Sequence, residues 1–199
     1  MSPLHNQRAR RIAAAAMILV TVAPFTTACS RNEGGIAFAA NTDNAESSAA
    51  QFIPAARRGD PIDLSGKLLD GRTFNLVSVK GRPVVINFWG SWCAPCAEEF
   101  PELRTAATRA KSQNLPVFFL GFNQRESPET AAAAYRRYKI PFSSLRNDGG
   151  KGLNSFGTPI SSFPTTLVLD REHRLAGRFL GPVTAHSLLQ MVEDVDKPA

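Results

Sequence analysis

The sequence predicts an α/β protein with a mixed central sheet, helices on both faces of that sheet and an N-terminal β-hairpin. Two nearly continuous apolar runs, at residues 84–89 and 115–122, are typical of strands that are buried on both faces. A segment of helical character follows each run, and a hairpin and a last helix complete the chain. This order of strands and helices favours one mixed sheet.

Two hairpins are expected from pairs of short extended runs. The runs lie at residues 63–69, 72–76, 165–169 and 175–180. Asp70-Gly71 separates the first two runs and is a dipeptide that favours a tight turn. A polar stretch beginning at Asp170 separates the last two. A further short extended piece is expected at residues 142–146.

Three helices are expected, each with a recognisable beginning. They cover residues 93–111, residues 128–138 and the segment after Thr184. Ser127 and Thr184 have side chains that can cap the second and third helices, and Pro128 suits a first helical turn. Pro101 lies inside the first helix and should kink it, because proline has no N–H for the backbone hydrogen bond.

Residues 1–28 have the pattern of an export signal. Three arginines, at positions 8, 10 and 11, precede an apolar stretch at residues 12–23 that is too short for a comfortable membrane span. Thr26-Thr27-Ala28-Cys29 resembles a bacterial lipobox, in which Cys29 becomes the lipid-modified N-terminus, although leucine is usual where Thr26 stands. The alternatives are an ordinary signal with an incidental Cys29 or an uncleaved anchor.

Residues 29–58 are expected to be a flexible tether and residues 59–199 the folded domain. The first of these segments is rich in Ala, Asn, Ser and Gly and has no sustained apolar period. Without the arginines of the signal, the chain has 20 basic and 17 acidic side chains. This small excess, with no basic stripe among aromatic residues, argues against a nucleic-acid partner.

Trp92-Cys93-Ala94-Pro95-Cys96 is the stretch with the clearest chemistry. It follows the strand at residues 84–89 and begins a helix, and a helix N-terminus favours a thiolate because of its partial positive charge and unpaired N–H groups. Three cysteines are too few for a disulfide framework. The pattern therefore predicts a redox-active cysteine pair.

Two metal-binding functions are the alternatives to a redox role for this pair. A structural zinc ion takes four Cys or His ligands, but no further ligands at suitable spacing accompany Cys93 and Cys96. Two thiolates suit Cu(I), so a copper-delivery module stays open, although no Met or His cluster lies near this pair. We expect no resident metal and no cofactor.

The Cys93/Cys96 motif after a buried strand, together with Pro101 and the later Phe163-Pro164, resembles the thioredoxin fold. More narrowly, the Asp70-Gly71 hairpin, the Asn87-Phe88-Trp89 strand end and Glu99 resemble the TlpA/ResA-like extracytoplasmic thiol–disulfide oxidoreductases. The resemblance covers residues 60–195. It implies that the chain reacts with the disulfides or dithiols of other proteins.

The resemblance also implies roles for individual residues around the two cysteines. Cys93 would be the exposed nucleophile, and Cys96, one helical turn later and more buried, would resolve the mixed disulfide. Pro164 would be a cis-proline that turns the backbone of Phe163 toward an extended substrate, which would pair with it by β-addition. Trp92 would shield the thiolate and touch the substrate.

Three other residues near the cysteines complete the expected site. Ala94 and Pro95, between the cysteines, would tune the redox potential. Glu99 lies three residues after Cys96 and shares its side of the helix, whereas Glu98 points away. We expect Glu99 to act as acid and base for Cys96, with a carboxyl pKa raised by partial burial. The alternative is a solvated helix glutamate.

The expected function is that of a membrane-tethered, monomeric thiol–disulfide oxidoreductase outside the cytoplasm. The resemblance favours a reductant that receives electrons from a membrane thiol transporter and reduces exported proteins such as apocytochrome c. A secreted or periplasmic location without a lipid anchor is the alternative. An oxidant that introduces disulfides into secreted proteins is the other enzymatic possibility, and the redox potential would separate the two.

Overall fold

A computed structural model describes residues 49–147, 155–157 and 160–197. The expected signal at residues 1–28, Cys29 and residues 30–48 of the expected tether lie outside this part of the chain, so these expectations stay predictions. Among the described residues, no helix combines the length and the apolar character needed to cross a membrane.

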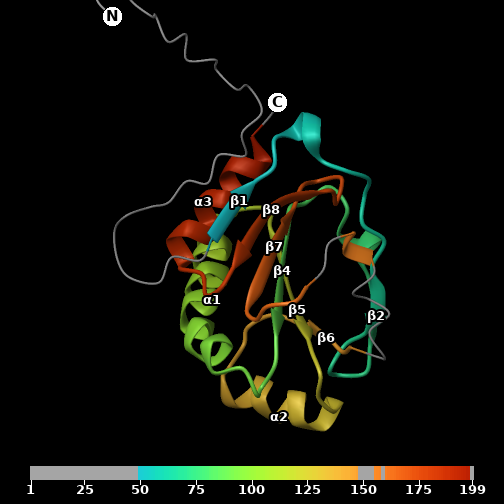
Figure 1. The fold of residues 1–199 in the computed structure, drawn as a ribbon, viewed down its shortest axis with the longest axis vertical. Coiled ribbons are helices and arrows are strands. Elements are labelled where there is room, and N and C mark those ends of the chain that lie inside the picture. The colour runs from blue at the N-terminus through green and yellow to red at the C-terminus, as the bar shows by residue number, and fades with distance from the viewer. Residues whose placement is uncertain (1–48, 148–154, 158–159, 198–199) are drawn as a thin grey trace, which may run out of the picture. The chain divides into compact units, whose positions relative to one another are not determined.

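A six-stranded mixed sheet forms the centre of the folded unit, in the order β1-β8-β7-β4-β5-β6 (Figure 1). Its strands are β1 (Ala49–Phe52), β4 (Val84–Trp89), β5 (Phe118–Asn123), β6 (Ser144–Leu145), β7 (Thr165–Leu169) and β8 (Leu175–Leu180). β5 pairs in parallel with β4 and β6, whereas the β4–β7, β7–β8 and β8–β1 pairs are antiparallel. Every residue of β4 is buried, as its apolar run predicted.

The N-terminal hairpin consists of β2 (Ser65–Lys67) and β3 (Thr73–Asn75), which form a separate two-stranded antiparallel sheet. Gly71 in the connecting turn has a φ of 87°, a conformation that side-chain-bearing residues rarely adopt. The turn that Asp70-Gly71 predicted between two strands is therefore confirmed. The second expected run, residues 72–76, ends where the 3₁₀ helix η2 (Leu76–Val79) begins.

The three α-helices begin close to the expected residues. They are α1 (Ala94–Ser112), α2 (Pro128–Arg137) and α3 (Ala185–Asp196). The Ser127 hydroxyl accepts a hydrogen bond from the Thr130 N–H, and the Thr184 hydroxyl accepts one from the Ser187 N–H. Helix α1 continues through Pro101 without ending. The expected caps are confirmed, whereas the kink at Pro101 stays a prediction.

Helical segments lie on both faces of the sheet, as expected, but the three α-helices share one of these faces. Buried side chains of α1, α2 and α3 belong to one apolar cluster, which includes Val85 and Trp89 of β4. The opposite face, with Ile86 and Phe88, packs against Phe74 of the hairpin and Leu76 of η2. Parallel β4–β5 and β5–β6 crossovers progress in the same direction across the sheet, so their right-handedness places α1 and α2 on the same face.

The folded part of the chain begins earlier than the expected residue 59. Strand β1 pairs with β8, and the 3₁₀ helix η1 (Ala55–Arg57) follows it. The Arg58 side chain is 6% exposed and donates to the Ile53 carbonyl at 3.0 Å and to the Asp170 carboxylate at 3.1 Å. The tether expected at residues 29–58 is therefore wrong for residues 49–58, which belong to the folded unit.

We expect the Asp170 carboxylate to contribute strongly to the stability of the folded unit at this end of the sheet. It is 3% exposed, and it also pairs with Arg174 at 2.8 Å. Asp170→Asn keeps the shape but leaves the buried Arg58 guanidinium without its counter-charge, and loss of one partner of a buried pair costs about 3–5 kcal/mol. Urea unfolding of the purified protein measures this loss.

Asp196→Asn is the matched control for that experiment. Asp196 pairs with Arg171, whose side chain is 47% exposed, and exposed pairs contribute about 1 kcal/mol or less. An equally small loss for both variants would show that the Asp170 pair does not stabilise the folded unit.

Candidate active site

Strand β4 leads through a short turn to Cys93, which caps the N-terminus of α1. The Cys93 Sγ accepts a hydrogen bond from the backbone N–H of Cys96 at 3.2 Å. Pro95 has no N–H, so the amide of Cys96 is the group that completes this cap. The positive end of the helix dipole and this N–H both favour negative charge on the sulfur.

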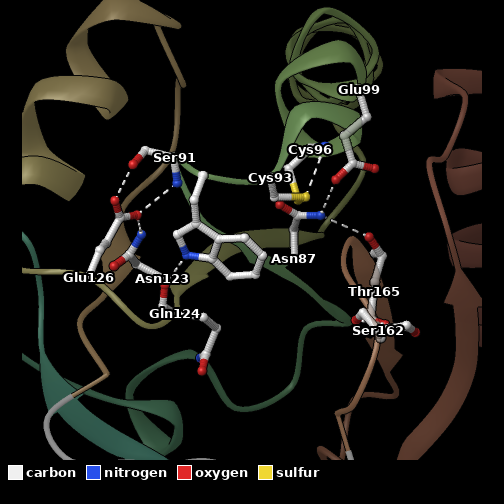
Figure 2. The surroundings of a disulfide bond; sticks show 12 residues. Asn87, Ser91, Cys93, Cys96, Glu99, Asn123, Gln124, Glu126, Ser162 and Thr165 are labelled. Carbon is white, nitrogen blue, oxygen red and sulfur yellow. Dashed lines mark hydrogen bonds between the residues drawn. A yellow bond between two sulfur atoms is a disulfide. The ribbon is translucent and has the colours of Figure 1, made fainter.

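Cys93 and Cys96 are joined in a disulfide bond (Figure 2). Cys93 is 5% exposed and Cys96 is fully buried. Cys96 is the more buried of the two, as expected, whereas the expectation of an exposed Cys93 is wrong for the disulfide form. Ala94 and Pro95 between them are exposed, and their effect on the redox potential stays a prediction.

Glu99 lies one turn after Cys96 with its side chain turned inward, and the residue is 2% exposed. Burial raises the pKa of its carboxyl group to about 7, although hydrogen bonds from Asn87 and from the Val183 N–H oppose the rise. Glu98 is exposed. The solvated glutamate considered from the sequence is therefore wrong for Glu99, whereas its role as acid and base stays a prediction.

Asn87 connects the Glu99 carboxyl group to the strands. Its Nδ2 donates to Glu99 Oε1 at 2.8 Å and to Thr166 Oγ1 at 3.1 Å, and Figure 2 shows the Asn87 and Glu99 side chains pointing toward one another beside the disulfide. The Asn87 Oδ1 is buried and accepts no hydrogen bond from the residues that the structure describes. A buried carboxyl group is thus held at a fixed position next to the cysteine pair by a residue that does not titrate.

The Phe163–Pro164 peptide bond is cis, as the resemblance implied. It leads into β7, whose first residue, Thr165, pairs with Phe88 of β4. The Phe163 ring packs edge-on against Trp92, with 5.3 Å between the ring centroids. Trp92 is 48% exposed. The structure therefore brings together the two loops that were expected to bind substrate, while their contact with a substrate stays a prediction.

The loop after β5 holds the turn before Cys93, and the sequence analysis did not predict this contact. The Ser91 N–H donates to the Glu126 carboxylate at 2.8 Å, and the Ser91 hydroxyl and the Asn123 side chain donate to it as well. The Trp92 Nε1 donates to the Gln124 carbonyl at 2.9 Å (Figure 2). Because β5 is parallel to β4, its end meets the same edge of the sheet, so the polar residues after β5 were the available signal.

Gly90 in this turn is required by the position of Trp92. A Cβ atom at residue 90 would lie 2.4 Å from the Trp92 Nε1, which is closer than real contacts allow. Trp89, one residue earlier, is fully buried and packs against Phe100, while its Nε1 donates to the Ser144 hydroxyl. Trp89 thus belongs to the core, and Trp92 lies at the rim of the site.

The cysteine pair does not line the cavity beside α2. A cavity of about 840 Å³ lies between α2 and β5, lined by residues such as Arg82, Tyr135 and Phe142, and its lining includes neither cysteine. Among the residues that the structure describes, no three Cys, His, Asp or Glu side chains are arranged to hold a metal ion. The reactive chemistry that this site offers is that of two sulfurs and a buried carboxyl group.

A family model described as Redoxin matches residues 45–197 of the chain. The chain belongs to the Redoxin family. The matched range includes β1, which supports the earlier start of the folded unit. With its Cys93–Cys96 pair, this Redoxin is a thiol–disulfide oxidoreductase of the TlpA/ResA-like kind that the sequence resemblance implied.

Individual relatives agree with this assignment. The chain is 30% identical over 132 residues to thioredoxin-like protein YneN of Bacillus subtilis, and the match covers 66% of this chain and 75% of the relative. It is 27% identical over 129 residues to thiol-disulfide oxidoreductase ResA of the same organism, covering 65% and 69%. A solved structure of a secreted thiol-disulfide isomerase from Corynebacterium glutamicum matches with a TM-score of 0.63 and 28% identity, over 80% of this chain and 99% of that one. The expected thioredoxin-like fold is confirmed.

Proposed function

We propose that this protein reduces disulfides in exported proteins, such as the haem-binding cysteines of apocytochrome c, and regains its electrons from a membrane dithiol carrier. Cys93 is the nucleophile, Cys96 the resolving thiol and Glu99 the group that accepts and returns the proton of Cys96. The observation that carries the proposal is the Cys93 sulfur at the N-terminus of α1, with the buried Glu99 one turn after Cys96.

The reaction transfers two electrons in two exchange steps. In the first step, the Cys93 thiolate attacks a substrate sulfur, which forms a mixed disulfide and releases the other substrate sulfur as a thiolate. In the second step, Cys96 gives its proton to the Glu99 carboxylate and attacks the Cys93 sulfur. This step closes the Cys93–Cys96 disulfide and releases the second substrate thiolate. Both released thiolates take up protons, so the substrate gains two electrons and the protein loses two.

The pKa of Glu99 suits this proton transfer. A carboxyl group that titrates near pH 7 is partly ionised at neutral pH, so it can accept the Cys96 proton and return it on the reverse path. The cysteine pair lies beside the exposed Trp92, and neither cysteine lines the described cavity, which favours a protein substrate over a small molecule. The resemblance to the TlpA/ResA-like proteins favours the reducing direction.

The register of the sheet supports a tether that joins the folded unit near the site. Ala49 of β1 pairs with Leu180, Leu180 pairs with Thr165, and Thr165 pairs with Phe88 beside the end of β4. The chain therefore enters β1 at the edge of the sheet that carries the cysteines, about 14 Å from β4 at the usual strand spacing. If Cys29 carries lipid and residues 30–48 form the proposed tether, a flexible chain of this length would have a root-mean-square end-to-end distance of about 25 Å.

The reduction potential tests the direction of electron transfer. Equilibrating the purified protein with glutathione buffers of known potential and counting its free thiols gives this value. A potential well below about −200 mV is expected for the proposed reductant. A potential near −120 mV would contradict the proposal and favour a disulfide-forming oxidase. Stoichiometric Cu(I) binding without disulfide exchange would instead favour the copper-delivery alternative.

A further inference from the structure

Arg125 places a positive charge beside the aromatic pair Trp92 and Phe163, next to the disulfide. The Trp92 ring directly precedes the nucleophilic cysteine in sequence, and the Phe163 ring directly precedes the cis-proline. The Arg125 guanidinium carbon lies 5.9 Å from the centroid of the Trp92 ring and 5.3 Å from that of the Phe163 ring. A cation within about 6 Å of an aromatic ring is attracted to it, so one side chain spans both loops of the site.

The backbone of the loop holds Arg125 in this place. Its φ is 59°, in the left-handed region that few residues other than glycine adopt. The neighbours on both sides are fixed, because the Gln124 N–H donates to the Trp89 carbonyl at 2.8 Å and Glu126 accepts hydrogen bonds from Ser91. An unfavourable backbone conformation that its surroundings maintain is common at functional sites. The position of this arginine is thus set by the same contacts that hold the turn before the cysteines.

The charge of Arg125 is available to a partner. The residue is exposed, and within the described ranges its guanidinium forms no ion pair. The neighbouring Glu126 carboxylate is already engaged with Ser91 and Asn123. A polypeptide that lies against Trp92 and Phe163 would therefore meet an uncompensated positive charge next to the reacting sulfur.

We propose that Arg125 makes the site selective for polypeptides that carry a carboxylate beside the cysteine under attack. The proposal rests on the function proposed above, in which the substrate lies extended along Phe163. Residues in an extended strand are about 3.3 Å apart, so a substrate side chain one or two positions from its cysteine falls within reach of the long arginine side chain. An acidic side chain there gains an ion pair, whereas a lysine side chain meets like charge.

The test uses three synthetic peptides that contain one intramolecular disulfide and differ only at the residue before the first cysteine, which is Glu, Gln or Lys. The second-order rate constant for oxidation of the reduced protein is measured for each. The wild-type protein is expected to react about fivefold faster with the Glu peptide than with the Lys peptide at low salt. The ratio should approach one as added salt screens the charges.

Variants at Arg125 separate charge recognition from a structural effect. Arg125→Gln should abolish the preference and Arg125→Glu should reverse it, whereas Arg125→Lys should keep it. Arg137→Gln is the matched control, because Arg137 is also exposed and its guanidinium carbon lies 5.9 Å from the ring centroid of Tyr138, the residue after α2. This control should retain the wild-type ratio. A structural role of Arg125 would change all three rates together and leave their ratio unchanged.

The outcomes distinguish this inference from the proposed function. An unchanged Glu-to-Lys ratio in Arg125→Gln, or equal wild-type rates for the three peptides, would overturn the charge selectivity while disulfide reduction stands. Failure of the reduced protein to react with any of the peptides would overturn the function on which the selectivity rests.

Discussion

Cys93→Ser is expected to abolish disulfide reduction, with a loss of at least about 10³-fold in the rate for a peptide disulfide. The thiolate is the attacking group, and a serine hydroxyl at the same place is not ionised at neutral pH. The helix N-terminus that favours negative charge on sulfur cannot compensate for this difference. Steady-state reduction of the peptide, with a chemical dithiol as the electron source, measures the rate.

Two other cysteine variants serve as controls. Cys96→Ser should still perform the first attack but should stop at one equivalent of mixed disulfide per protein, which intact mass detects. Cys29→Ser should leave the rate of the purified protein unchanged, because Cys29 has no part in the exchange. Substantial turnover by Cys93→Ser, or a mixed disulfide on Cys93 that Cys96 does not resolve in the wild type, would contradict the assigned roles.

Glu99→Gln is expected to change the pH dependence of both stability and reaction. The folded protein holds a proton on Glu99 up to about pH 7, whereas the unfolded chain loses it near pH 4.5. The native state thus binds more protons between these values, so this group's contribution to the stability falls as the pH rises from about 4.5 to about 7. The change amounts to about 3 kcal/mol, since each pKa unit corresponds to about 1.4 kcal/mol.

The measurement compares urea unfolding of the oxidised wild type and Glu99→Gln from pH 4.5 to 8. The unfolding free energy of the wild type should fall relative to that of Glu99→Gln as the pH rises. The contributions of titrating groups that both proteins share cancel in this difference. The rate of Cys96 reaction should also lose its inflection near pH 7 in Glu99→Gln. Glu98→Gln, altered on the exposed side of α1, should match the wild type in both respects. A parallel pH dependence for Glu99→Gln and wild type would refute a buried, titrating Glu99.

Much of the fold was predictable because its signals are local. The apolar run of β4, the Asp70-Gly71 turn and the caps Ser127 and Thr184 each specify structure within a few residues. The cysteine pair and the cis-proline at Pro164 were equally predictable, because each has a distinctive residue type at a fixed place relative to a strand. The inward side of Glu99 followed from helical spacing alone.

The parts that were missed depend on contacts between distant segments. Strand β1 has no alternating pattern, and its place in the sheet comes from pairing with β8 and from the Arg58–Asp170 pair, 112 residues apart in sequence. The common face of α1 and α2 follows from β6, a two-residue strand with a weak local signal. The place of Arg125 beside the cysteine pair depends on contacts of its guanidinium with two rings from other loops, which no local pattern predicts.

Reversible closure of one disulfide between Cys93 and Cys96 is the central step of the proposed reaction. Thiol alkylation of Cys29→Ser across a series of glutathione buffers, read by intact mass, tests this directly. We expect a single two-electron transition between the reduced form, with two alkylated cysteines, and the oxidised form, with none. A pair that stays reduced or oxidised across the whole series, or that passes through a stable form with one alkylated cysteine, would contradict it.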